Sequence, residues 1–121
     1  FILGASAFSQ GKFLDELREL ARSDDLWRRR VAVISTLYFL RKGEGALTIE
    51  LAAQLIDDER DLMHKAIGWM LREMGDRVDA AMLRAFLKEH APRMPRTMLR
   101  YAIEKFPDPE RARWLAVKRA R

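Results

Sequence analysis

Three basic residues recur along the sequence at a spacing of 35 residues: Arg30, Lys65 and Arg100. The six-residue segments around them, 27–32, 62–67 and 97–102, align in the same register at successive shifts of 35. Repeats of about this length are typical of stacked helix pairs, in which equivalent positions line up along one surface. The spacing predicts a row of three cations, and such a row is suited to bind the phosphates of a nucleic acid.

The charge of the chain is concentrated toward its C-terminus. The 121 residues include 23 Lys and Arg against 18 Asp and Glu, a formal net charge of +5. Residues 93–121 hold nine basic and three acidic residues, a net charge of +6, whereas residues 1–92 carry a net charge of −1. A basic end on a neutral body favours a polyanionic partner, although a run of charge is also typical of an ordinary solvated face.

The hydrophobic pattern predicts an all-α protein, because apolar residues recur at helical spacing and no segment alternates with a period of two. Short breaks with Gly, Pro or Asp separate the helices, which indicates antiparallel pairs stacked as an α-solenoid of HEAT-like repeats with about six or seven helices. The first expected helix is Ser9–Arg22. The second follows the N-cap candidates Ser23, Asp24 and Asp25 and runs to about Arg41, with Gly43 and Gly45 ending it. The other expected helices are a third from Ala46 or Thr48 to about Ile56, a fourth after Asp57 and Asp58 to about Met74 with Gly75 ending it, a fifth from about Val78 to His90, a sixth from Pro95 to before Pro107, and a seventh from Pro109 to the C-terminus.

Trp69 lies on the polar side of the fourth expected helix, about 40° from Lys65 and about 60° from Arg72 at 100° per residue. Two interpretations stay open. The indole packs against the next helix pair, or it meets a sugar or base while the neighbouring cations hold phosphate. Gly68 favours the second, because a glycine inside a helix costs about 1 kcal/mol and usually reflects a close approach.

Arg30 precedes the apolar run Val31–Leu40, which has so few polar residues that we expect this helix to be buried on nearly all sides. A guanidinium beside such a run needs an acceptor. Pairing with Asp57 or Asp58 and binding of an external phosphate are the two alternatives, which the sequence does not separate.

Composition excludes several classes. The chain has no Cys and only two His, so we expect no disulfide, no metal and no cofactor. No apolar run reaches the roughly 18–20 residues that span a bilayer. These features fit a single cytoplasmic domain over residues 1–121. Because the sequence begins with Phe1, we expect it to be the C-terminal portion of a longer protein.

Two strings carry a family resemblance: Ser23–Ala32, which reads SDDLWRRRVA, and Asp61–Glu73, which contains KAIGWMLRE. They resemble the C-terminal half of the AlkD-type DNA alkylation repair family, and KAIGWMLRE is the most specific part. The segment Pro95–Lys105 resembles the closing helix of that family. The resemblance covers about Phe13–Phe106.

The resemblance implies an α-solenoid that wraps alkylated double-stranded DNA and a DNA glycosylase that hydrolyses the N-glycosidic bond of N3- or N7-alkylated purines. It assigns catalytic and DNA-binding roles to Arg30 and Trp69. Lys65, Arg72 and Arg100 would be supporting DNA-binding residues. Alkylation makes the purine a better leaving group, so such a site has to stabilise a cationic deoxyribose.

One departure limits this interpretation. The family's Trp-Trp-Asp-x-Val-Asp segment, which carries the catalytic aspartate, is absent and would align just before Phe1, so we expect the chain alone to be inactive. The aspartates present lie at expected helix starts and are better explained as caps: Asp24, Asp25, Asp57, Asp58 and Asp61. A non-catalytic DNA-binding repeat protein stays open as an alternative. So does a protein-binding adaptor with a methionine-rich surface, although the spacing of the six methionines favours the core.

Overall fold

The computed structural model describes the backbone of residues 3–118 and the side chains of residues 11–118. Every regular element in this range is a helix. The helices are α1 (Leu3–Ala21), α2 (Leu26–Ser35), α3 (Leu37–Leu40), α4 (Ala46–Gln54), α5 (Asp61–Arg77), α6 (Ala80–His90), the 3₁₀ turn η1 (Ala91–Arg93), α7 (Arg96–Ala102) and α8 (Asp108–Leu115). The predicted all-α class is confirmed.

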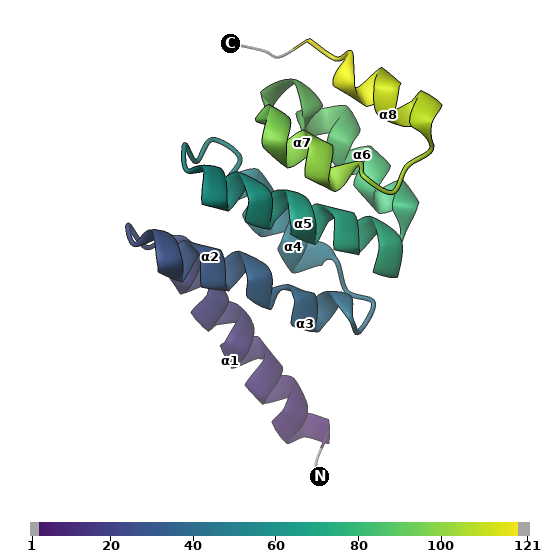
Figure 1. Ribbon diagram of the computed structural model, residues 1–121. Coiled ribbons are helices and arrows are strands. Elements are labelled where there is room, and N and C mark those ends of the chain that lie inside the picture. The colour runs from purple at the N-terminus through teal and green to yellow at the C-terminus, as the bar shows by residue number, and fades with distance from the viewer. Residues whose placement is uncertain (1–2, 119–121) are drawn as a thin grey trace.

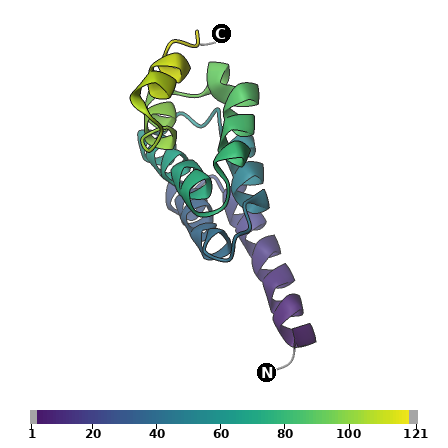
Figure 2. The ribbon, with the colours of Figure 1, turned by 90° about the vertical axis from the view of Figure 1, so that its right-hand side faces the viewer.

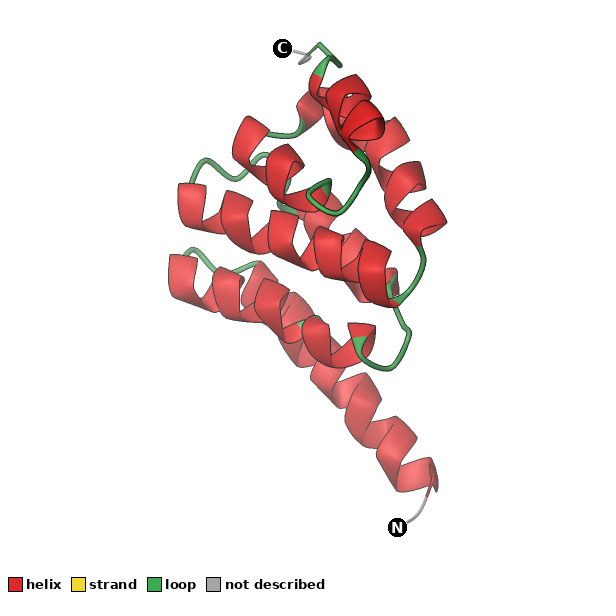
Figure 3. Cartoon of the chain, turned by 45° about the vertical axis from the view of Figure 1, so that its right-hand side comes forward, coloured by secondary structure: helices red, strands yellow, loops and turns green. Residues whose placement is uncertain are grey.

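The helices stack in pairs that form two layers (Figures 1 and 2). One layer contains α1, α4 and α6, and the other contains α2, α5 and α7, with α8 following α7 at the end of the stack. Short loops join the helices (Figure 3). The arrangement agrees with the predicted α-solenoid of helix pairs, and we call the layer of α2, α5 and α7 the second-helix layer.

The second-helix layer explains the 35-residue spacing. Its three helices begin at Leu26, Asp61 and Arg96, which are themselves 35 residues apart. Arg30, Lys65 and Arg100 are therefore each the fifth residue of their helix. Equivalent positions on stacked helices of one layer lie in register, so the predicted alignment of the three residues is confirmed at the level of the backbone.

Helix α5 lies at the centre of the core, between α2 and α7, and makes its most extensive contact with α7. Its apolar face is buried completely and supplies much of the core. Among the six methionines, Met82 is partly buried against the core and the others are fully buried: Met63, Met70, Met74, Met94 and Met98. The expectation that most methionines belong to the core is confirmed. The adaptor alternative depended on a methionine-rich surface, and the methionines do not form one.

Gly68 is buried where α5 meets α7. A Cβ atom at this position would lie 2.6 Å from the Cβ of Tyr101 and 2.7 Å from the carbonyl oxygen of Met98. The glycine therefore permits close contact with another helix. The interpretation that Gly68 marks a close approach to nucleic acid is wrong, because the space beside it is filled by α7.

The second expected helix is interrupted. The buried hydroxyl of Thr36 donates a hydrogen bond to the carbonyl oxygen of Val33 at 2.7 Å, and α2 ends at Ser35 before α3 begins. A threonine hydroxyl that bonds to the preceding turn competes with the helical pattern and bends the helix. Gly43 then ends this segment as predicted, with a φ of 82° that favours glycine.

Other helix ends differ from the predicted ones. Gly75 does not end α5, which continues to Arg77. A Cβ at Gly75 would lie 2.6 Å from a methyl group of Leu83, so this glycine also serves helix packing. Helix α1 begins at Leu3 rather than Ser9. Helix α8 ends at Leu115 rather than at the C-terminus, and residues 119–121 lie outside the described range.

The expectation that the helix after Arg30 is buried on nearly all sides is wrong. Val31 is 52% exposed and Tyr38 is 45% exposed, because α2 and α3 lie at the end of the second-helix layer. The equivalent of Val31 in α5 is Ala66, which is buried. The same repeat position is therefore buried in α5, which has a neighbouring helix on both sides, and exposed to solvent in α2.

The contact at Gly68 predicts opposite effects for two glycine-to-alanine changes. Gly68→Ala should lower the free energy of unfolding by about 2 kcal/mol, because the added methyl group forces α5 and α7 apart. Gly11→Ala is the control, since nothing lies within 4 Å of its Cβ position in α1, and it should stabilise the chain by about 0.5–1 kcal/mol. Urea unfolding measures both. Equal effects of the two changes would show that helix propensity alone decides the result.

Candidate nucleic-acid interface

The three cations of the second-helix layer differ in whether another side chain already neutralises them. Lys65 pairs with Asp61 one turn earlier at 3.2 Å, and both side chains are largely exposed. Arg30 and Arg100 have no hydrogen bond or ion pair with any described residue. Arg30 and Arg100 therefore keep their full charge for an external anion, whereas the exposed Lys65–Asp61 pair is weak enough to exchange partners.

Arg30 is half-buried, and its Nε is shielded from solvent without an acceptor. The proposed internal partners are both taken. Asp58 accepts a hydrogen bond from Nε of Arg29 at 2.9 Å, and Asp57 accepts one from Arg93 at 2.6 Å. Pairing of Arg30 with Asp57 or Asp58 is therefore wrong. A guanidinium with a buried, unsatisfied donor retains a free-energy gain for whichever acceptor reaches it.

Trp69 combines the two interpretations left open by the sequence. Its side chain is partly buried against the core, and its Nε1 donates a hydrogen bond to Oε1 of Glu73 at 3.2 Å. Glu73 also accepts a hydrogen bond from Arg77 at 2.9 Å. The indole is therefore held by packing and by a carboxylate one turn away, while part of it stays accessible.

Burial acts to raise the pKa of the Glu73 carboxyl, but the hydrogen bonds from Arg77 and Trp69 outweigh burial and hold this pKa below its ordinary value of 4.5. Glu73 is consequently ionised at neutral pH. Its charge keeps the indole of Trp69 in one orientation on the helix surface.

Arg72 is less available than the sequence indicated. It donates a hydrogen bond to Glu104 at 2.8 Å and lies 3.9 Å from Glu73, so α5 and the turn after α7 are joined through it. Its Nε is buried without a partner. Arg72 lies in the second-helix layer, but two carboxylates already offset its charge.

Four of the five aspartates predicted as caps do cap or pair within the described part of the chain, whereas Asp24 makes no hydrogen bond or ion pair with a described residue. Asp25 caps α2 by accepting a hydrogen bond from the backbone N–H of Trp27 at 2.9 Å, which confirms its predicted role. The start of α5 differs in detail: Arg60 occupies the cap position, and Asp58 accepts a hydrogen bond from its backbone N–H. Asp61 is the first residue of α5, where a negative charge favours the helix dipole.

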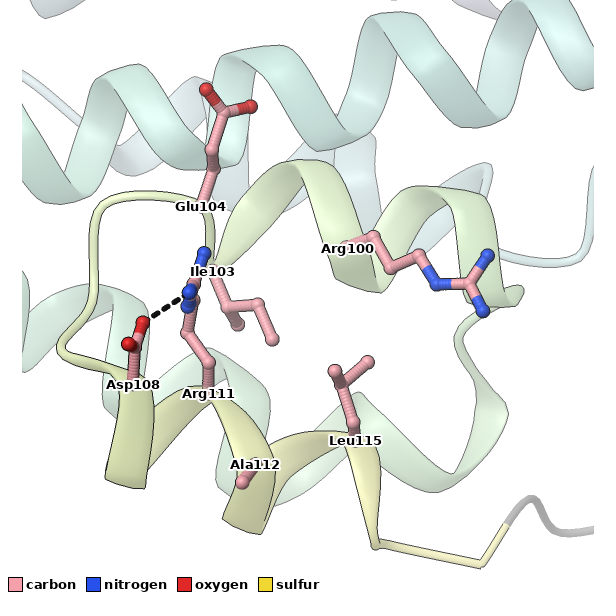
Figure 4. A pocket seen from close by; sticks show the side chains of 7 residues that line it. All are labelled: Arg100, Ile103, Glu104, Asp108, Arg111, Ala112 and Leu115. Carbon is pink, nitrogen blue, oxygen red and sulfur yellow. Dashed lines mark hydrogen bonds and ion pairs between the residues drawn. The ribbon is translucent and has the colours of Figure 1, made fainter.

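A cavity of about 400 Å³ lies between α7 and α8 at the end of the cation row (Figure 4). Ile103 and Leu115 form part of its apolar wall, and the side chain of Arg100 extends along one side of it (Figure 4). Arg111 forms an ion pair with Asp108 on the opposite side. The charges that line the cavity are therefore largely balanced by ion pairs, apart from the charge of Arg100.

One exposed aromatic residue was missed by the sequence reasoning. Trp27 is 61% exposed, the largest exposed fraction among the large hydrophobic side chains described. It precedes Arg30 by three residues on α2, and positions three apart share one face of a helix. The repeat alignment offered a signal, because Trp27 aligns with Leu62, which is also exposed.

Within residues 11–118, no group of three or more His, Cys, Asp and Glu side chains is arranged to hold a metal ion. Within the described helices, none is both long enough and apolar enough to cross a membrane.

The sequence matches the model of one protein family, described as DNA alkylation repair enzyme, over residues 2–106. The chain belongs to the DNA alkylation repair enzyme family. The matched residues include every helix from α2 to α7, and thus the whole second-helix layer of this repair-family protein. Helix α8 lies beyond the match. No curated protein and no solved structure matches the chain.

The Glu73 network predicts a pH-dependent contribution to stability. A carboxyl whose pKa is lowered by folding stabilises the folded state above its ordinary pKa, and this contribution is lost as the pH falls through the lowered value. The difference in free energy of unfolding between the native repair protein and its Glu73→Gln variant should be constant above about pH 5 and shrink below 4.5. Urea unfolding at a series of pH values measures it. A difference that does not change with pH would exclude a stabilising role for the charge.

Proposed function

We propose that the chain is the DNA-binding part of an alkylpurine DNA glycosylase, and that it holds alkylated double-stranded DNA against the second-helix layer. Membership of the DNA alkylation repair family supports a role in DNA repair. The observation that carries the finer proposal is Arg30, a half-buried guanidinium in register with Lys65 and Arg100 and without an internal acceptor.

The spacing of the row fits a phosphate backbone. The axes of packed helices lie about 8–10 Å apart. Along one DNA strand this distance corresponds to about two to three nucleotides, because each nucleotide rises about 3.4 Å along the duplex axis. Long Arg and Lys side chains accommodate the difference from any one phosphate spacing. Trp69 lies one turn beyond Lys65 and would meet the sugar next to a bound phosphate.

The proposed reaction is hydrolysis of the N-glycosidic bond of an N3- or N7-alkylated purine. The positive charge on such a base makes it a better leaving group, so the protein has to hold the deoxyribose, stabilise its developing positive charge and admit water. In this proposal Arg30 binds the backbone phosphate and the indole of Trp69 faces the deoxyribose. Lys65 and Arg100 hold flanking phosphates, and Arg72 contributes less because of its internal ion pairs.

The described carboxylates near the row favour binding over catalysis by this chain alone. Glu73 is held by Trp69 and Arg77, and Asp58 is held by Arg29. A carboxylate that stabilises a cationic sugar has to face it, so we expect the proposed reaction to use a carboxylate other than Glu73 and Asp58. A DNA-binding protein without glycosylase activity would share the same cation row and is the second candidate.

The cation row predicts a salt-dependent affinity for duplex DNA. Lys65→Ala and Arg100→Ala should each reduce the slope of log K against log salt by about 1, because each removes one phosphate contact. Fluorescence anisotropy between about 50 and 200 mM salt measures the slope. Arg22→Ala is a matched control, since this exposed arginine directly follows α1, a helix of the other layer, and should leave the slope unchanged. If all three variants had the same salt slope, DNA would bind to a surface other than the cation row.

The glycosylase proposal is tested by release of 7-methylguanine from alkylated duplex DNA. We expect the 121-residue chain alone to release none, and a longer protein that carries the Trp-Trp-Asp segment to be active. In that protein Trp69→Ala should reduce excision about 100-fold, and Arg30→Ala should reduce it by a similar factor, because each removes a contact to the reacting nucleotide. Arg30→Ala should leave the midpoint of thermal unfolding nearly unchanged, since Arg30 has no internal partner. Loss of folding in step with loss of activity would show that both residues are structural.

A further inference from the structure

Trp27 differs from the other two tryptophans of the chain. Trp69 and Trp114 each bury part of the indole and donate their Nε1 to a carboxylate one turn away, Glu73 at 3.2 Å and Glu110 at 3.1 Å. The indole of Trp27 is 61% exposed and makes no hydrogen bond or ring contact with a described residue. A single exposed hydrophobic side chain is ordinary, so the case for a contact surface depends on what lies beside Trp27.

Trp27 belongs to a second row that runs beside the cations. It is the second residue of α2, Leu62 is the second residue of α5, and both are exposed. Each precedes the cation of its own helix by three residues, which places it on the same face about 4.5 Å away along the helix axis. The third position of this row, Thr97 in α7, is polar.

We propose that Trp27 and Leu62 form an apolar strip that packs against the deoxyribose units of duplex DNA. This inference rests on the proposed function, because Arg30 and Lys65 have to hold the phosphates for the strip to meet the sugars between them. The strip supplies affinity that does not depend on counterion release, in contrast to the cations.

The same observations disfavour a protein helix as the occupant of the strip. A helix packed over Trp27 would also cover Arg30, whose guanidinium has no acceptor, and burial of an unpaired charge is costly. The change from Trp27 and Leu62 to Thr97 also ends the apolar strip after two helices, whereas a docked helix needs a continuous apolar face. A DNA backbone presents apolar sugar next to anionic phosphate and satisfies both rows at once.

The first test compares affinities of variants of the 121-residue chain for an undamaged duplex. Trp27→Ala should weaken binding about tenfold, as expected for loss of an aromatic contact, and should leave the salt slope unchanged. Trp27→Phe should recover most of the affinity. Val31→Ala is the control, because Val31 is exposed on the same helix but aligns with Ala66, which is buried inside the stack; it should change affinity less than twofold.

The second test observes the indole directly. Protein labelled with 5-fluorotryptophan has three fluorine resonances, which single Trp→Phe changes assign. In the free chain the Trp27 resonance should show the largest solvent isotope shift. Duplex DNA should move the resonances of Trp27 and Trp69, while that of Trp114 in α8 stays in place.

The outcomes separate this inference from the proposed function. If Lys65→Ala reduces the salt slope while Trp27→Ala binds normally and its resonance ignores DNA, the strip is excluded and the cation row stands. If the chain shows no salt-dependent DNA binding, both proposals fail. If Val31→Ala and Trp27→Ala weakened DNA binding equally, the contact would involve the exposed end of the helix stack and not the strip. A Trp27 resonance that is protected without DNA and exposed on dilution would mean that a second copy of the chain covers the strip. Either of these last two results overturns the inference.

Discussion

The packing of α5 against α7 is the contact on which the candidate interface depends. Helix α5 has its whole apolar face in the core, and Gly68 lets the backbone of α7 approach it where any side chain would collide with Tyr101 and Met98. Because helices are rigid over these lengths, the position of α7 relative to α5 also fixes the position of Arg100 relative to Lys65. A glycine in the core thus sets the geometry of charges on the surface.

The distribution of internal ion pairs matters more for function than the net charge of +5. Pairs across helices occupy many of the basic residues, including Arg18 with Glu50, Arg84 with Glu110 and Lys105 with Asp76. Exposed pairs of this kind contribute little to stability, typically about 0–1 kcal/mol, but they reduce the positive field of the residues they join. Arg30 and Arg100 have no ion pair with a described carboxylate. Other basic residues such as Arg41 and Lys88 are also unpaired within the described part of the chain, but Arg30 and Arg100 belong to the one row that the repeat brings into register.

The sequence predicted the features that depend on periodicity and missed those that depend on neighbours. The spacing of Arg30, Lys65 and Arg100 was sufficient to identify the second-helix layer, since a repeat places equivalent residues alike. Gly68 and Gly75 were misread because a glycine that ends a helix and a glycine that admits a neighbour look the same in sequence. The exposure of Val31 was also hidden, because burial of an apolar helix depends on which helices flank it.

Glu73 has a positioning role within the proposed site. Glu73 is ionised and accepts a hydrogen bond from Trp69, which makes it one described candidate to stabilise a cationic sugar. However, its oxygens accept hydrogen bonds from the indole Nε1 and from Arg77, and these contacts are what lower its pKa against the effect of burial. A carboxylate so occupied has little of its charge left for an external cation. We infer that Glu73 positions the indole of Trp69 and does not itself stabilise a cationic sugar in the proposed site.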